Sequence, residues 1–174
     1  MRKVLWPVGY VAAIVLANVL TEHFGLVPAG FGLMTTAGTY AAAFVIVSRT
    51  FTQDVIGKRM VLVLMGIGVI LTWVLASPIL AVASGVAFAL SEAADMAVYT
   101  PLRNRGRSRA VALASGVGAV VDTFVFLWIA GFPLSAAPGQ LVVKIGMGLL
   151  AALILWLVKG RRAVPSQPLR TRRH

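Results

Sequence analysis

The sequence predicts an all-α membrane protein, with six transmembrane helices in one compact bundle. Hydrophobic residues make up 59% of the chain and charged residues only 12%, whereas a soluble domain carries about 25% charge. Six apolar stretches of 17 to 20 residues match the length needed to cross a hydrocarbon core of about 30 Å. Barrel strands would be half as long and would alternate in polarity, so these stretches indicate helices.

The six stretches follow one another with short connections and leave no room for a second, soluble domain in 174 residues. The first is too long for a secretory signal, and no clear cleavage site follows it. Residues 160–174 are basic and interrupted by proline, which predicts a disordered cytoplasmic tail after a membrane domain of residues 1–159. We expect the helices over about residues 4–20, 31–47, 60–76, 80–99, 111–130 and 141–158.

The basic residues predict the orientation of the chain. Of its 16 lysines and arginines, 15 lie at the N-terminus, in residues 49–59, in the four-arginine loop of residues 103–109 or from residue 159 onward. These segments share one side of the membrane, and the three opposite turns carry no basic residue. By the positive-inside rule both termini are cytoplasmic, in a cytoplasmic (inner) membrane. The net charge of +11 therefore indicates topology and attraction to the lipid bilayer, and no nucleic-acid partner is expected.

Three of the five acidic residues, Glu92, Asp95 and Asp122, fall inside expected helices. A charge at the centre of a bilayer costs about 2.5–3.5 kcal/mol on insertion scales, so such residues mark function by default. Glu92 lies roughly 10 Å from the cytoplasmic end of its helix, and Asp95 is nearer the surface. Two interpretations of Asp95 stay open, namely contact with a substrate and a salt bridge to an arginine of the adjoining loop.

Asp122 lies near the expected midplane, on the same helix face as Ser115 and Phe126. Small residues around it favour close packing of helices, but they do not account for the carboxylate. Lys144 is the one cation inside an expected span. It either extends to the outer surface, or pairs with Asp122 or a substrate, because an unpaired charge in hydrocarbon is costlier than a paired one.

These groups predict a solute-binding site and not an enzyme. The sequence has no Walker loop, HExxH, GxSxG or dinucleotide motif. It has no cysteine and only two histidines, so we expect no catalytic residue, cofactor or metal site. Carboxylates accept hydrogen bonds from N–H groups, and aromatic side chains stack on planar rings. A flat, donor-rich heterocycle is therefore the favoured small-molecule partner.

Five parts of the chain also carry a family resemblance. They are LANVLTEHFGLVPAGFG with Asn18 and Gly30, FTQDVIGKR with Asp54, SEAADMAVYTPLR with Ser91, Glu92, Asp95 and Tyr99, ASGVGAVVDTFVFLWIAGF with Ser115, Asp122, Thr123 and Phe126, and the last helix with Lys144. Together they resemble the queuosine-precursor transporter family, formerly called vitamin-uptake transporters. That family often has an aspartate where Thr50 stands and amides where Gly116 and Val120 stand, and these departures bear on the substrate more than on the fold.

The resemblance implies a fold similar to the substrate-binding subunits of energy-coupling-factor transporters, and uptake of a 7-deazaguanine base. A guanine edge presents N1–H and the 2-amino group as adjacent donors, which suits one carboxylate. The residues that the resemblance and the chemistry together assign to substrate binding are Asn18, Glu92, Asp95, Ser115, Asp122, Phe126 and Lys144.

Several alternatives stay open at this point. The chain could carry another planar heterocycle or vitamin as an energy-coupling-factor subunit, or be a non-transporting assembly or regulatory protein with structurally paired charges. A lone carrier could use a proton or ion through Asp122 or Glu92, whereas a subunit would need energy-coupling partners. The small residues Ala13 and Ala17 are a candidate docking face for such a partner. A homo-oligomer is equally compatible with the sequence.

Overall fold

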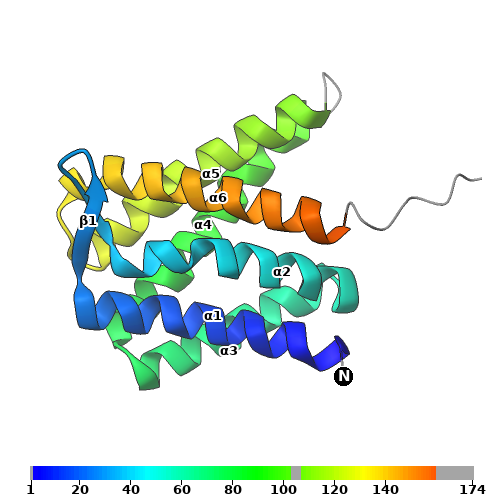
Figure 1. Ribbon diagram of the computed structural model, residues 1–174, viewed down its shortest axis with the longest axis horizontal. Helices are drawn as coiled ribbons and strands as arrows, with labels where there is room; N and C mark the ends of the chain where they lie inside the picture. The colour runs from blue at the N-terminus through cyan, green and yellow to red at the C-terminus, as the bar shows by residue number, and fades with distance from the viewer. Residues whose placement is uncertain (1, 103–106, 160–174) are drawn as a thin grey trace, which may run out of the picture.

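The computed structural model describes residues 2–102 and 107–159 (Figure 1). The predicted cytoplasmic tail of residues 160–174 lies outside the described residues. The six long helices are α1 (Arg2–Phe24), α2 (Ala42–Ile56), α3 (Lys58–Leu75), α4 (Pro78–Leu102), α5 (Arg107–Ile129) and α6 (Ala137–Lys159). The prediction of an all-α protein with six helices is confirmed.

The second predicted helix is wrong over its first eleven residues. Residues 26–36 instead form an antiparallel hairpin of β1 (Leu26–Gly30) and β2 (Leu33–Thr36), and the 3-10 helix η1 (Ala37–Ala41) leads into α2. Gly30, Phe31 and Gly32 have positive φ angles of 89°, 52° and 74°. Three successive residues in this region turn the chain back on itself and cannot belong to a right-handed helix.

Helix α2 also extends further than the sequence predicted. It continues through residues 48–56, which were predicted to form a polar loop. No glycine or proline interrupts the chain between residues 39 and 56, and the helix ends at Gly57, whose φ is 83°. Arg49 therefore lies inside a helix and not on the cytoplasmic flank. The orientation prediction then rests on the other 14 of these 15 charges.

The surface of the helices is that of a membrane protein. By length and composition, three stretches of the described chain can cross a bilayer, namely Val4–Phe24, Pro78–Leu102 and Leu134–Ala151, and shorter apolar helices cover Arg59–Leu75 and Leu113–Ile129. Large apolar side chains point outward along them, with Trp128 74% and Val74 73% exposed. Such surfaces are disfavoured in water and are favourable against lipid.

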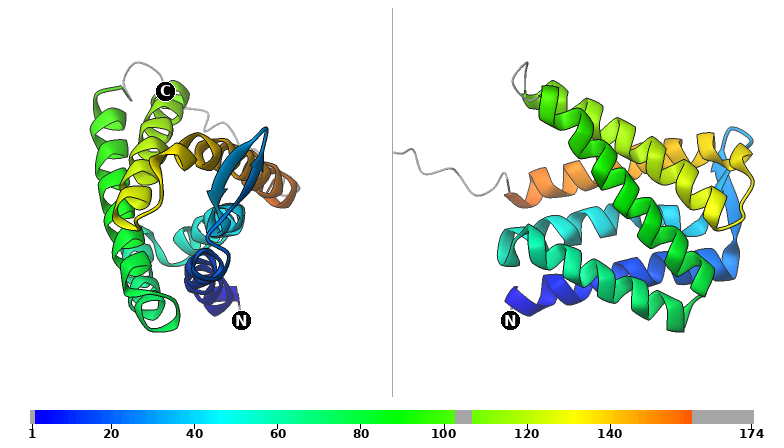
Figure 2. Two further views of the ribbon diagram at one scale, coloured as in Figure 1. Left: turned by 90° about the vertical axis from the view of Figure 1, so that its left-hand side faces the viewer. Right: turned by 180° about the vertical axis from the view of Figure 1, so that it is seen from behind.

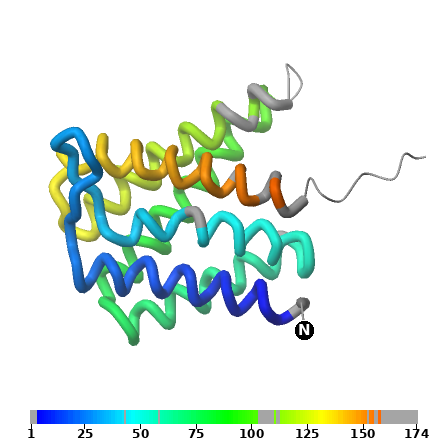
Figure 3. Tube along the Cα trace, viewed as in Figure 1, coloured from blue at the N-terminus to red at the C-terminus, as the bar shows by residue number. Residues whose placement is uncertain are grey.

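The helices form two walls, which the end view in Figure 2 shows best. One wall is the pair α4 and α5, which pack most extensively against each other; the other contains α1, α2 and α6, and α3 connects α2 to α4. The hairpin lies at one end, and the first turn of α1 and the last turn of α6 lie at the other, as the Cα trace in Figure 3 shows. The hairpin end thus corresponds to the predicted outer side.

Two glycines let the hairpin end pack directly on the helices. A methyl group added at Gly38 of η1 would overlap the carbonyl oxygen of Ala17 in α1, and one added at Gly139 of α6 would overlap that of Met34 in β2. Ala13 is fully buried. Ala13 therefore packs within the chain, which contradicts the expectation that Ala13 and Ala17 form an external docking face.

We expect Gly139→Ala to destabilise the protein, because the added methyl group meets backbone that cannot move independently. Overpacking of this kind costs about 1–3 kcal/mol, which corresponds to a fall of several degrees in melting temperature. Gly146→Ala on the same helix is the matched control, since nothing lies within 4 Å of the added methyl group. Thermal unfolding in detergent measures the stability of both variants. Equal melting temperatures would contradict the close packing of Gly139 against the hairpin.

The arrangement of the turns gives a test of orientation. Gly25 and Ser77 follow α1 and α3, and Ala136 precedes α6, so all three should lie outside if both termini are cytoplasmic. Reporter fusions made after these residues should give an external signal. A cytoplasmic signal at any one of them would show that the orientation is wrong.

Candidate functional site

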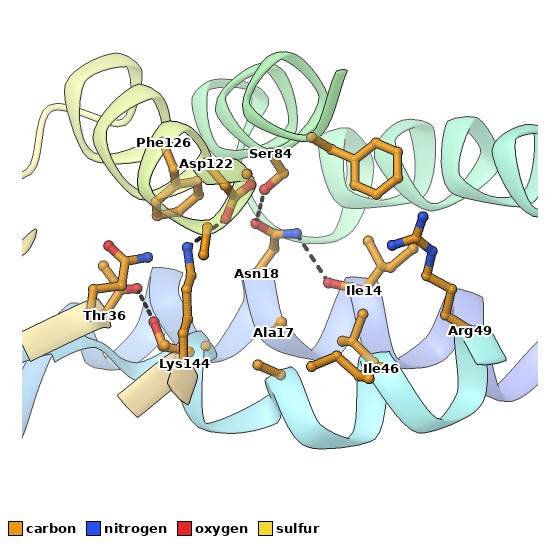
Figure 4. Close-up of a pocket in the computed structure, with 18 of the residues that line it drawn as sticks. Ile14, Ala17, Asn18, Thr36, Ile46, Arg49, Ser84, Asp122, Phe126 and Lys144 are labelled. Carbon is orange, nitrogen blue, oxygen red and sulfur yellow. Dashed lines mark hydrogen bonds and ion pairs between the residues drawn. The ribbon is translucent and has the colours of Figure 1, made fainter. Parts of the chain in front are cut away.

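A cavity of about 600 Å³ lies between the two walls (Figure 4). This volume falls within the range of about 300–1,000 Å³ typical of small-molecule sites. All six helices, η1 and the end of β2 contribute to its lining, which is mostly apolar with a few polar side chains. The polar and charged side chains of the lining are Tyr10, Asn18, Thr21, Thr36, Thr39, Arg49, Ser84, Ser115, Asp122, Gln140 and Lys144.

An ion pair between α5 and α6 lies in this cavity. Lys144 Nζ is 2.5 Å from Asp122 Oδ2 and also donates a hydrogen bond to Thr123 Oγ1 at 2.8 Å. The lysine therefore points inward to the carboxylate and does not extend to the outer surface. Asp122 keeps a third of its side-chain surface exposed, against 18% for Lys144, so the carboxylate remains accessible to a ligand.

A second polar contact joins α1 to α4. Asn18 is 5% exposed, and its Oδ1 accepts a hydrogen bond from Ser84 Oγ at 2.7 Å. Its Nδ2 donates to the carbonyl oxygen of Ile14, one turn earlier in the same helix, at 3.0 Å. Both ends of the amide are thus held within the protein, and Figure 4 shows the side chain reaching across the cavity.

The third contact, between α2 and α4, involves a residue that the sequence analysis missed. Arg49 donates from Nη2 to Glu92 Oε1 at 2.6 Å, and its guanidinium carbon lies 5.1 Å from the centroid of the Phe88 ring. Arg49 lines the cavity, whereas Glu92 is not among the lining residues. Glu92 is therefore placed to position Arg49, and we do not find it facing the space that a ligand would fill.

Of the other residues predicted to bind substrate, some line the cavity and one does not. Ser115 and Phe126 line the cavity with Asp122, as their shared helix face predicts, but Asp95 does not line it. Asp95 is half-buried where α4 packs on Gly118 of α5. The loop of residues 103–106 lies outside the described residues, so a salt bridge from Asp95 to an arginine there stays a prediction.

Gln140 and the threonines of the hairpin end were also missed. Gln140 lay one residue before the predicted last helix, and Thr36 and Thr39 lay in a stretch predicted to be helical. The available signal was the glycine turn at residues 30–32, which moves the hairpin and η1 to the end of the bundle. With that turn recognised, these polar residues would have been expected at the outer end of any internal site.

The three contacts Asn18–Ser84, Arg49–Glu92 and Asp122–Lys144 all connect one wall to the other. Two of them are ion pairs, so the charges of these four ionic side chains cancel. A neutral ligand can enter such a site without leaving an uncompensated charge, whereas a charged ligand would do so and would bear a desolvation cost. The geometry therefore suits an uncharged, partly polar molecule.

Comparison with protein families shows the family to which the chain belongs. It matches the family described as "Putative vitamin uptake transporter" over residues 7–159, which includes all or most of every helix. The chain belongs to this family. The resemblance deduced from the sequence motifs is therefore confirmed, and the protein is a membrane transporter by family. Comparisons with curated proteins and with solved structures gave no match.

The Asp122–Lys144 pair leads to a stability prediction. Lys144→Met should lower the melting temperature, because it leaves the carboxylate inside the helix bundle without its cation. The double variant Asp122→Asn/Lys144→Met should recover most of this loss, since neither charge remains. Thr123→Val is the control that removes only the second acceptor of Lys144, and its effect should be smaller. Thermal unfolding measures these variants. A fall in melting temperature in the double variant equal to the sum of the falls in the two single variants would contradict the pairing.

Proposed function

We propose that this protein is a multi-pass protein of the cytoplasmic membrane that imports a queuosine precursor, a base of the 7-deazaguanine type. The single observation that carries the proposal is the internal cavity with the Asp122–Lys144 pair beside an apolar lining. A transporter needs a solute site inside its helices, and this is the site that the described helices enclose.

The chemistry of the cavity supports a flat, uncharged base. The Asp122 carboxylate accepts two adjacent N–H groups, such as N1–H and the amino group on the pyrimidine ring of a guanine. Phe126 and Phe88 offer aromatic surface for a planar ring. Lys144 holds Asp122 in place before the base arrives, and then remains within reach of Thr123 and of a carbonyl oxygen on the base.

A second candidate is another planar heterocycle, such as a vitamin, which the family description favours. The chain has Thr50 where the queuosine-precursor family often has an aspartate, and Gly116 and Val120 where it often has amides; of these three residues, only Gly116 lines the cavity. Competition decides between the two candidates. If an unlabelled vitamin displaces labelled 7-deazaguanine at a lower concentration than unlabelled 7-deazaguanine does, the vitamin is the tighter ligand. If energy-coupling subunits drive transport, they dock on a surface other than Ala13 and Ala17.

The decisive variant is Asp122→Asn, assayed by uptake of labelled 7-deazaguanine into cells that cannot make their own. The amide keeps the shape of the side chain but loses the charge and one acceptor. A hydrogen bond to a charged group is worth about 1.5–3 kcal/mol, so affinity should fall by roughly 10- to 100-fold. The variant leaves Lys144 without its anion, so uptake is compared at equal amounts of the two proteins in the membrane.

Asp54→Asn is the matched control for this experiment. It makes the same chemical change on α2 at a residue that does not line the cavity, and it should leave affinity unchanged. Uptake by Asp122→Asn at the level of the unmodified protein would remove this carboxylate from the mechanism. Cells that gain no uptake from the unmodified protein, while it is present in their membranes, would refute the proposed substrate.

A further inference from the structure

Gln140 gives the cavity a buried hydrogen-bonding group that no part of the mechanism above uses. Gln140 of α6 is 3% exposed and lines the cavity, and its Oε1 atom is buried with no hydrogen-bond partner in the described part of the chain. Asn18, the other amide of the lining, has both ends bonded. A buried acceptor without a donor is unfavourable, so its presence beside a ligand site requires an explanation.

The position of Gln140 is fixed by the backbone around it. The preceding residue, Gly139, packs against the backbone of Met34 in β2 too closely to admit a side chain. Lys144 follows Gln140 by one helical turn, so both side chains project from the same face of α6. The amide is therefore held at the hairpin end of the cavity, next to the Asp122–Lys144 pair, on a segment that cannot easily shift.

The amide can present its oxygen to a ligand with little rearrangement. The terminal torsion of a glutamine side chain is broad and roughly two-fold. A half-turn about it exchanges the oxygen and the nitrogen, so Oε1 moves from its covered position toward the space that the residue lines. The nitrogen then takes the covered position, and the amide offers its oxygen to the ligand.

We propose that Gln140 is a specificity-determining residue that accepts a hydrogen bond from a ring N–H of the substrate. This inference rests on the proposed function. A 7-deazaguanine base has three N–H sites: N1–H, the exocyclic amine and the pyrrole N–H. The carboxylate of Asp122 satisfies the first two, which are adjacent, and leaves the pyrrole N–H on the other ring. Gln140 supplies the acceptor for that remaining donor.

The consequence is selection for the free base. A nucleoside carries its sugar on the same pyrrole nitrogen, so it lacks this N–H and adds bulk against Gln140. A site that merely stacks a planar ring would not make the distinction. The residue therefore separates bases from nucleosides and from isosteric rings without the donor.

The test combines a change in the protein with a change in the ligand. The two ligands are the 7-deazaguanine base and its furan analogue, in which oxygen replaces the pyrrole N–H with almost no change in shape. The unmodified, detergent-purified protein should bind the base about 2- to 10-fold more tightly than the furan analogue, as expected for one neutral hydrogen bond. In Gln140→Leu the two ligands should bind equally, at the affinity of the furan analogue.

Thr52→Val is the matched control. Thr52 is fully buried and its Oγ1 also lacks a partner in the described residues, but it does not line the cavity. Its loss should leave the preference for the base intact. Gln140→Met provides a second apolar side chain of similar length if Gln140→Leu is poorly produced, and both should unfold, without ligand, at or above the temperature of the unmodified protein, because they remove an unpartnered polar group.

The outcomes separate this inference from the proposed function. Equal preference for the base in Gln140→Leu, Gln140→Met and the unmodified protein would overturn the role of Gln140 and leave the proposed function standing. A fall in ligand-free stability with unchanged preference would show that Gln140 is structural. Binding of neither ligand by the unmodified protein would refute both the proposed function and the inference that rests on it.

Discussion

The requirement that charges inside a bilayer be paired governs the interior of this protein. Asp122 and Lys144 come from α5 and α6, and Arg49 and Glu92 come from α2 and α4, so each pair spans the boundary between the two walls. Removing one partner would leave a charge in a medium that solvates it poorly. The pairs therefore fix which faces of four helices meet, and the cavity is the space that remains between them.

The hairpin end obeys a different constraint, which is close backbone packing. Gly38 and Gly139 let η1 and α6 approach their neighbours without an intervening side chain, and Gly38 N also donates to Thr21 Oγ1 at 3.0 Å. This end is closed by contacts that tolerate little movement. The polar pairs, by contrast, are side-chain contacts that can separate and reform, so any opening of the cavity is more easily accommodated between the walls than under the hairpin.

The sequence predicted the features that depend on local composition. Apolar length located the helices, and the cost of an isolated charge indicated that Asp122 and Lys144 are functional or paired. It did not predict the hairpin, because Thr35 and Thr36 sit in an apolar stretch that resembles a helix when the turn at Phe31 is overlooked. Because of that error, Gln140 was not predicted to lie at the hairpin end of an internal site. The Arg49–Glu92 pair could not be found from the sequence, because it depends on how α2 and α4 face each other in the folded chain.

The balance of charges in the cavity has an electrical consequence. The fixed charges of Arg49, Glu92, Asp122 and Lys144 sum to zero, and the base proposed as substrate is neutral. A carrier that moves such a base alone transfers no charge through the membrane field, so the resting voltage does no work on that step. Accumulation against a gradient then depends on a co-transported ion or on chemical energy supplied by another subunit, and without either one, transport proceeds only until the concentrations on the two sides are equal.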